Sequence, residues 1–275
     1  DLDDLARKAG GDARVLLLSH MRGHIVDMER VRRICSDHGL LLIEDCAHTL
    51  GARWNGTKSG RFGDVACFSL QTFKHINAGE GGILTTDDED IAAQAILYSG
   101  SYMLYEQNGA RPPLAVFEQY RERIPNYSLR MNELVAAVAR PQIDLLAERT
   151  ARWKTLYALL AERLDAIPGV TVPARPEKED FVPSSIQFSL TDLDAAAIED
   201  VLKRCREQGV DIKWFGGATP AGFTSTFEHW RYLAGEHTLP GTRATLAALC
   251  DMRIPLSLKD ADCHEIADIV TAAIA

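Results

Sequence analysis

Short apolar runs alternate with helical patterns through the first half of this chain of 275 residues. Residues 14–20 (RVLLLSH) and 40–45 (LLLIED) are almost continuously hydrophobic, which is typical of strands buried in a parallel sheet. Between them, residues 27–38 carry apolar side chains on one helical face, and Gly39 provides a natural helix end. This alternation predicts an α/β domain with a mainly parallel sheet.

The alternation continues beyond residue 60. Residues 65–70 (VACFSL) and 82–86 (GILTT) predict a third and a fourth strand, and residues 88–98 predict a helix that ends near Gly100. Four strands are few for a doubly wound sheet that carries a ligand site. We therefore expect an N-terminal region to precede this sequence.

A long helical pattern over residues 132–167 leads into a second unit. Pro141 is expected to kink or divide this helix, because proline cannot donate the backbone hydrogen bond. We predict residues 1–150 to be part of a large domain and residues 151–275 to form a smaller C-terminal α+β domain. Asp260 is the predicted N-cap of the last helix.

Composition excludes several classes of protein. The net charge of -9 argues against nucleic acid or an anionic membrane as a partner. No apolar run approaches the about 20 residues that a membrane-spanning helix needs. The six cysteines form no C-x-x-C pair and the eight histidines no ligand pattern, so we expect reduced thiols in a cytoplasmic protein and no metal site.

Three polar features follow strand ends in the first half. Asp45 closes the apolar run LLLIED, at the kind of sheet edge where open α/β sheets bind ligands. Ser69 ends the next run, and Lys74 comes five residues later. The glycine-rich turn at 79–82 (GEGG) then returns the chain into a strand. These groups are therefore expected to meet at one edge of the sheet.

An amine, a carboxylate and a hydroxyl at one edge match the needs of pyridoxal 5′-phosphate (PLP). The amine holds the cofactor aldehyde, the carboxylate pairs with the pyridine nitrogen, and hydroxyl or amide groups bind the phosphate. Lys74, Asp45 and Ser69 supply one group of each kind. Each signal alone is weak, and their order and spacing carry the inference.

The segment EDCAHTLGARWNGTKSGRFGDVACFSLQTFKHINAGEGGILTTDDED resembles the core signature of the nucleotide-sugar aminotransferase family (StrS/DegT type). This family belongs to fold type I of the PLP enzymes, the aspartate-aminotransferase fold. The segments SHMRGHIVDMERV and NYSLRMNELVAAVARPQID are similar to further family segments in the same order. The resemblance is strong over about residues 1–165 and loose beyond them. Members of the family begin well before this chain's first residue.

The resemblance implies a role for each residue that matches the family's motifs. Lys74 is implied as the catalytic Schiff-base lysine, and Asp45 as the partner of the pyridine nitrogen. His48 is implied to contact the cofactor ring, and Ser69 its phosphate. Ser128 stands where the family has an asparagine that binds the phosphate of the neighbouring subunit, so the resemblance also implies a homodimer with shared sites.

Five further residues are candidate substrate contacts: His20, Arg22, His75, Asn126 and Arg130. Two of them depart from the family, because Arg22 stands where a tyrosine is usual and His75 where an asparagine is usual. The aromatic stretch over residues 214–232 fits either a substrate pocket or the core of the small domain.

The implied reaction moves an amino group from an amino acid, such as glutamate, to a keto-sugar that is attached to a nucleotide. One alternative is a PLP-dependent dehydratase, although some water-eliminating relatives replace the lysine by histidine and Lys74 is present here. Another is a non-catalytic, dimeric regulatory or scaffolding homologue, which the intact Lys74 and Asp45 argue against. A nicotinamide dehydrogenase is disfavoured because no G-x-G-x-x-G follows a strand.

Overall fold

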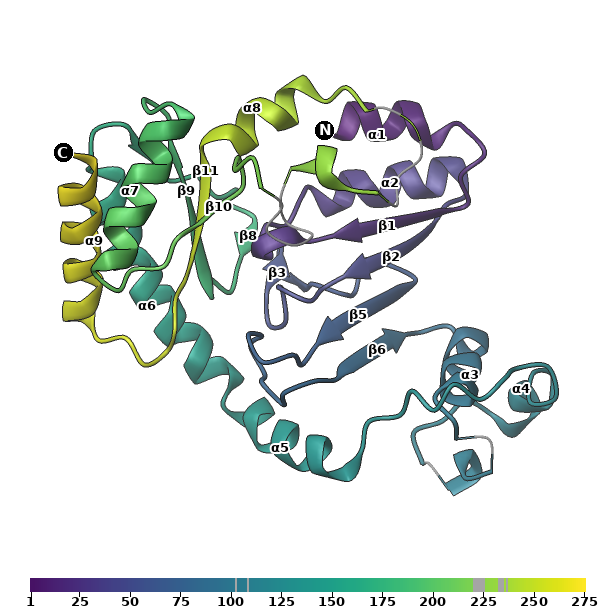
Figure 1. The fold of residues 1–275 in the computed structure, drawn as a ribbon. Helices are drawn as coiled ribbons and strands as arrows, with labels where there is room; N and C mark the ends of the chain where they lie inside the picture. The colour runs from purple at the N-terminus through teal and green to yellow at the C-terminus, as the bar shows by residue number, and fades with distance from the viewer. Residues whose placement is uncertain (102, 108, 220–225, 232–234, 236) are drawn as a thin grey trace. The chain divides into compact units, whose positions relative to one another are not determined.

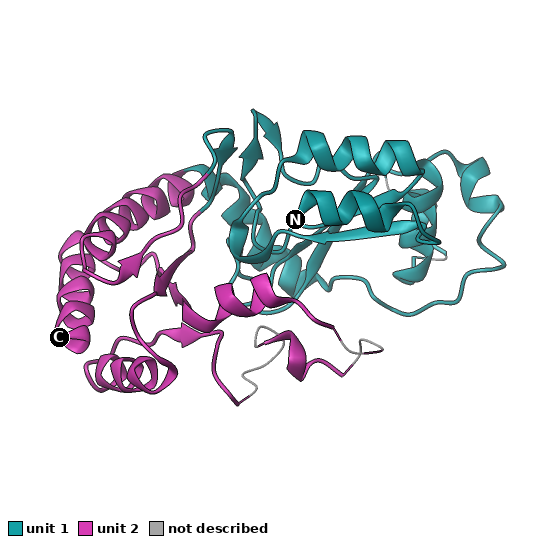
Figure 2. Ribbon diagram, turned by 90° about the horizontal axis from the view of Figure 1, so that it is seen from above, with its two compact units in different colours: residues 1–147, 176–182 teal, residues 148–175, 183–275 magenta. Residues whose placement is uncertain are grey.

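The computed structural model describes residues 1–101, 103–107, 109–219, 226–231, 235 and 237–275. It contains two compact units, shown in different colours in Figure 2. The first unit comprises residues 1–147 and 176–182, and the second comprises residues 148–175 and 183–275. The short segment 176–182 therefore belongs to the first unit, although the sequence places it beyond the predicted boundary.

The first unit holds the predicted α/β domain (Figure 1). Its helices and strands are α1 (Leu2–Ala9), β1 (Val15–Ser19), η1 (Met21–Gly23), α2 (Met28–His38), β2 (Leu41–Asp45), β3 (Arg53–Trp54), β4 (Thr57–Lys58), β5 (Val65–Ser69), β6 (Gly82–Thr86), α3 (Glu89–Tyr98), η2 (Tyr105–Gln107), α4 (Leu114–Glu118), α5 (Glu133–Asp144) and β8 (Glu179–Asp180).

The main sheet has the strand order β1-β2-β5-β6. Strands β1, β2 and β5 are parallel, and β6 is antiparallel to β5. The carboxyl ends of β1, β2 and β5 therefore lie at one edge of the sheet, and the start of β6 lies at the same edge. The prediction of an α/β fold with a mainly parallel sheet is confirmed.

The two faces of this sheet differ in burial. Leu42 is fully buried, and Ala66 of the neighbouring strand shares its face and its burial. Helices α1 and α2 pack together beside β1 and β2 (Figure 1). On the opposite face, Leu17 is 67% exposed and Leu41 is also exposed. Among the residues that the structure describes, the expectation that these strands are buried is therefore confirmed for one face of the sheet and wrong for the other.

Local signals set the ends of the first helices. The Asp27 side chain accepts a hydrogen bond from the backbone N–H of Arg30 and caps α2. Gly39 ends α2 in the left-handed conformation, with φ 65°, as the sequence predicts. Asp88 caps α3 in the same way as Asp27 caps α2.

Two predicted helix features are corrected. Pro141 lies inside α5, and the long helix divides at Leu145, four residues later. Pro141 is the ninth of the twelve residues of α5, and the helix continues past it to Asp144 although proline lacks one backbone N–H. Lys259, not Asp260, is the N-cap of α9, and Asp260 is the first residue of that helix.

The second unit is a small α+β unit. Its antiparallel sheet has the order β10-β11-β9-β7, and α7 packs against α9. Its elements are α6 (Leu146–Asp165, whose first two residues lie in the first unit), β7 (Val170–Thr171), β9 (Ser185–Leu190), α7 (Ala195–Glu207), β10 (Lys213–Trp214), η3 (Phe227–His229), α8 (Pro240–Ala248), β11 (Leu249–Arg253) and α9 (Asp260–Ile274).

The aromatic stretch of the second unit is described in part. Phe215 and Phe227 are buried, as expected for core residues. Phe223 and Tyr232 lie outside the described residues. Within the ranges that the structure describes, no helix is long and apolar enough to cross a bilayer.

The contrast between the two sheet faces predicts the outcome of a matched pair of substitutions. Leu42→Ala should lower the free energy of unfolding by about 2–5 kcal/mol, because it leaves a cavity in a packed core. Leu17→Ala should lower it by less than about 1 kcal/mol, because that side chain is mostly exposed. Urea denaturation of both variants measures the difference, and equal losses would contradict the one-sided core.

Candidate active site

Asp45 is held at the carboxyl end of β2 by its neighbours. Its Oδ2 accepts a hydrogen bond from the hydroxyl of Ser19 at 2.8 Å, and its Oδ1 accepts one from the backbone N–H of Ala47 at 3.0 Å. The backbone N–H of His20 donates to the carbonyl of Asp45 at 3.1 Å. The carboxylate is thereby fixed in one orientation at the edge of the sheet.

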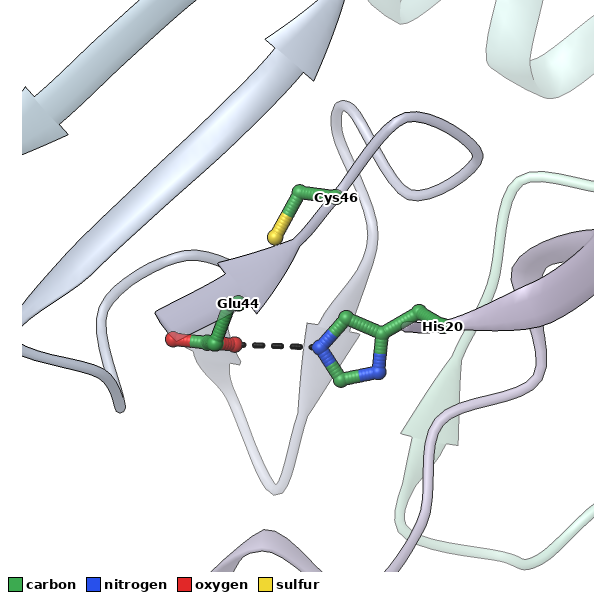
Figure 3. Close-up of side chains that lie close together, drawn as sticks. All are labelled: His20, Glu44 and Cys46. Atoms are coloured by element: carbon green, nitrogen blue, oxygen red, sulfur yellow. Dashed lines mark hydrogen bonds and ion pairs between the residues drawn. The ribbon is translucent and has the colours of Figure 1, made fainter. Parts of the chain in front are cut away.

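Glu44 precedes Asp45 and points to the opposite face, because side chains alternate along a strand. Its side chain is fully buried. Oε1 accepts hydrogen bonds from the backbone N–H groups of Phe62 at 2.8 Å and Gly63 at 2.6 Å. Oε2 accepts from the N–H of Gly60 at 3.1 Å and lies 3.1 Å from Nε2 of His20 (Figure 3). This carboxylate therefore joins β2, the turn after β1 and the loop at 60–63.

The hydrogen bonds decide the charge of Glu44. Burial by itself raises the pKa of Glu44, but hydrogen bonds from His20, Gly63 and Gly60 outweigh burial and hold the pKa below its usual value of 4.5. Glu44 is consequently an ionised carboxylate in the core. His20 donates to it through Nε2, which leaves Nδ1 as a buried nitrogen without a partner among the described residues.

Three potential metal ligands meet at this point. Atoms of His20, Glu44 and Cys46 lie within 4.8 Å of one another (Figure 3). Both oxygens of Glu44 already accept two hydrogen bonds each. Burial raises the pKa of the Cys46 thiol to about 11, whereas a metal ligand is a thiolate. These groups therefore fit a hydrogen-bonded arrangement within the core better than a metal site. Glu44 with its four hydrogen-bond donors is called the Glu44 clamp below.

Lys74 and His48 form a pair at the same edge of the sheet as Asp45. Nζ of Lys74 lies 3.0 Å from Nε2 of His48. Burial, and after it the charge of Lys74, lower the pKa of His48 to about 3. His48 is consequently neutral at physiological pH, and its Nε2 accepts the hydrogen bond from the lysine.

The loop that carries Lys74 is closed on itself. The backbone N–H of Leu70 donates to the carbonyl of Gly81 at 2.9 Å, and that of Thr72 donates to Gly79 at 3.0 Å. Ser69, at the carboxyl end of β5, accepts a hydrogen bond from the N–H of Gln71 at 3.2 Å. The glycine turn that follows the lysine thus holds both ends of its loop at the sheet edge.

The predicted substrate residues fall into two groups. Arg22 and His75 both lie close enough to His48 to lower the pKa of its ring. His75 is buried, and burial lowers its pKa to about 4, so it is neutral as well. His20 is also buried and is bound to Glu44. A substrate contact by any of these three residues stays a prediction.

The second group lies on an exposed segment that follows α4. The side chains of Asn126, Ser128 and Arg130 are exposed. The N–H of Arg130 donates to the carbonyl of Ser99 at 3.0 Å, and the Tyr127 ring stacks on Tyr98. Ser128 has a left-handed backbone with φ 53°, and its N–H donates to Oδ1 of Asn126. These contacts fix the segment to the end of α3, and its ligand roles stay predictions.

Sequence reasoning missed the roles of Ser19 and Glu44. A glutamate inside an apolar strand signals a partner, because a buried carboxylate is costly without donors. Ser19 carries no such signal, since its bond to Asp45 depends on the register of β1 against β2.

The first unit also contains a cavity of about 520 Å³ near the far end of β6. It is lined in part by Arg61, Thr86, Asp87 and Ile96, and none of the candidate site residues lines it.

Comparison with known proteins decides the family. Residues 1–271 match the DegT/DnrJ/EryC1/StrS aminotransferase family. The chain belongs to this family. The resemblance noted in the sequence is thereby confirmed, and it extends through the second unit.

Curated relatives match part of this sequence, and solved structures match the whole of this chain. GDP-perosamine synthase of Caulobacter vibrioides is 35% identical over 151 residues, which are 55% of this chain and 38% of that protein. L-glutamine:scyllo-inosose aminotransferase of Streptomyces griseus is 34% identical over 164 residues, 58% of this chain and 38% of that protein. The crystal structure of 3-amino-5-hydroxybenzoic acid synthase matches with a TM-score of 0.80 at 25% identity, covering 100% of this chain and 71% of that one. The chain thus spans less than half the length of these curated relatives.

The Glu44 clamp makes stability depend on pH in a defined direction. Because the pKa of Glu44 is lower in the folded state, its contribution is present above pH 4.5 and is lost as the pH falls through the folded-state value. Glu44→Gln should lower the free energy of unfolding by about 1–3 kcal/mol at neutral pH, since the amide accepts fewer of these hydrogen bonds. Urea denaturation should show this difference shrinking in acid.

Glu80→Gln is the control for this substitution, because Glu80 is an exposed glutamate of the same unit. It should change stability at neither pH. A loss for Glu44→Gln that stays constant from neutral to acidic pH would contradict an ionised clamp.

Proposed function

We propose that this protein is a PLP-dependent aminotransferase. It moves an amino group from an amino acid, with glutamate as the first candidate, to a keto-sugar that is attached to a nucleotide. The observation that carries the proposal is the Lys74–His48 pair at the same sheet edge as Asp45. Membership of the aminotransferase family supports it.

The residues at this edge fit the cofactor. Each oxygen of Asp45 accepts one hydrogen bond, and a carboxylate offers about four acceptor sites, so it can accept another from a pyridinium N–H. Lys74 presents a primary amine that is only partly buried. Ser69 lies at the end of the strand next to Asp45 and offers a hydroxyl donor to a phosphate.

When bound, PLP supplies an aldehyde that takes up the amino group and a ring that withdraws electrons from the reacting carbon. Asp45 would keep the ring nitrogen protonated, because its negative charge stabilises the positive one. Lys74 would hold the aldehyde, and its Nζ would carry a proton between neighbouring atoms of the site. His48, which stays neutral, orients Nζ by accepting its hydrogen bond.

The names of the relatives support a cyclic acceptor. One is a GDP-perosamine synthase and another an L-glutamine:scyllo-inosose aminotransferase. Solved members of the fold carry the titles of a PLP form and a PMP form of a sugar aminotransferase from Streptococcus pneumoniae. We place a nucleotide-linked keto-sugar first because GDP-perosamine synthases recur among the relatives from three organisms.

Covalent capture tests the cofactor and its lysine. Incubation with PLP followed by borohydride should attach the cofactor to the peptide that contains Lys74, as read by mass spectrometry. Lys74→Ala should abolish the attachment, whereas Lys58→Ala, which removes an exposed lysine of the same unit, should not. Asp45→Asn should weaken PLP binding about ten-fold or more, because the pyridinium loses its charged partner. Attachment spread evenly over surface lysines would contradict the proposal.

We also propose that the protein acts as a homodimer with shared sites. The α5 helix presents Leu134, which is 81% exposed, and Val138 one turn later, which is 53% exposed. Such adjacent apolar side chains on a helix are typical of a surface that a partner covers. The neighbouring segment at 126–130 is the one that the family resemblance assigns to the partner's site.

Sedimentation analysis tests the dimer. Leu134→Glu should shift the protein toward monomer, because it puts a charge into the proposed apolar interface. Leu104→Glu, at another exposed leucine of the first unit, is the matched control and should leave the distribution unchanged. An identical distribution for both variants and the wild type would place the interface elsewhere.

A further inference from the structure

A short segment from late in the sequence is built into the first unit. Residues 176–182 belong to the first unit, although the residues before and after them belong to the second. Within this segment, β8 pairs antiparallel with β3. The backbone N–H of Asn55 donates to the carbonyl of Lys178 at 2.7 Å. The segment is therefore held against β3, which is the next strand after His48 along the chain.

Glu179 joins this segment to the turn after β1. Its side chain is buried, and its Oε1 accepts a hydrogen bond from the backbone N–H of Ile25 at 2.7 Å. The turn itself contains Arg22 in the left-handed backbone conformation, with φ 56°. A residue with a Cβ atom is disfavoured there, and such a conformation persists only where the surrounding structure holds it. Glu179 supplies one such contact, at the end where the chain leaves the turn.

The same turn lies against the backbone of His48. Gly23 has φ 78°, and a Cβ atom at that position would lie 3.0 Å from the carbonyl oxygen of His48. The N–H of Gly23 donates to the carbonyl of His20 at 3.0 Å, and the N–H of His24 donates to that of Met21 at 3.2 Å. The turn is thus closed by its own hydrogen bonds. Because packed interiors transmit small displacements, movement of the turn is expected to move the backbone of His48.

Val182 gives the segment a second contact with the same region. It is buried, and its carbonyl oxygen lies 3.8 Å from the position of a Cβ atom on Gly23. Its Cγ2 lies 3.5 Å from the corresponding position on Gly51, which follows His48 by three residues. The segment at 176–182 therefore packs on the turn after β1 and on the loop that carries His48.

We propose that Glu179 is a positioning residue for the Lys74 amine and that it acts through the turn after β1 and through His48. The inference rests on the proposed function, in which Lys74 holds the cofactor. Nε2 of His48 lies 3.0 Å from Nζ of Lys74, so the orientation of the amine depends on where the His48 backbone is held. A reacting group that is misplaced by about 1 Å can lose about a hundred-fold in rate.

Two substitutions separate the position of the acceptor oxygen from the charge of Glu179. Glu179→Gln removes the charge and keeps an oxygen that can accept from Ile25. Glu179→Asp keeps the charge and withdraws the oxygen by the length of one methylene. Borohydride capture of PLP on Lys74 should be about ten-fold slower for Glu179→Asp and within about two-fold of the wild type for Glu179→Gln.

Glu177→Asp is the matched control, because Glu177 is an exposed glutamate of the same segment. It should leave the capture rate unchanged. Thermal unfolding of each variant verifies that folded proteins are compared. Slow capture for Glu179→Gln would overturn the proposal, because the charge would then matter rather than the position of the acceptor. A wild-type rate for Glu179→Asp would overturn it as well.

An NMR readout without cofactor tests the step through His48. The ring nitrogen signals of His48 should move in Glu179→Asp, because Nε2 loses its place beside Nζ of Lys74, and should stay in place in Glu179→Gln. Unmoved signals in both variants would overturn the proposal. If the wild type captures no PLP on Lys74 while the His48 signals move in Glu179→Asp, the proposed aminotransferase is refuted and the positioning of His48 by Glu179 stands.

Discussion

The buried carboxylate of Glu44 is the interaction on which the rest of the first unit depends. Its two oxygens accept from three backbone N–H groups of one loop and face the ring of His20. Since Glu44 and Asp45 are consecutive in β2, their side chains point to opposite faces. Glu44 thereby lies on the buried face, and Asp45 lies on the other face, where Ser19 and Ala47 hold its carboxylate. The orientation of Asp45 follows from how firmly Glu44 is held.

Helix ends and strand ends that depend on a few neighbouring residues can be predicted from the sequence. The helix α2 begins after Asp27 and ends at Gly39 because a cap and a left-handed glycine are local signals. The place of Asp45 at the sheet edge follows from the end of an apolar run. The exposure of Leu17 is not predictable in this way, because burial depends on what packs against the strand. Pro141 predicts that the long helix divides but not where, since the division of α5 from α6 falls at Leu145, four residues later.

The same distinction between local and long-range features applies to the candidate site. The place of Lys74 in its motif comes from the resemblance to a family, whereas its contact with His48 requires two loops to meet in space. The bond from Ser19 to Asp45 requires the register of two strands. The left-handed backbone of Arg22 cannot be predicted from composition or periodicity, because arginine rarely adopts this conformation. The sequence therefore predicts the candidate residues, and the structure shows which neighbours hold them.

The antiparallel direction of β6 determines how the loop that carries Lys74 is anchored to the sheet. A parallel strand after β5 would require a crossover that takes the chain to the far edge of the sheet. Because β6 runs back, residues 70–81 leave and re-enter the sheet at one edge, and hydrogen bonds between the two arms close the loop. Lys74 thus lies on a loop that is closed by its own hydrogen bonds. The distance from Lys74 to the sheet is therefore set within residues 70–81 and does not depend on the length of any other loop.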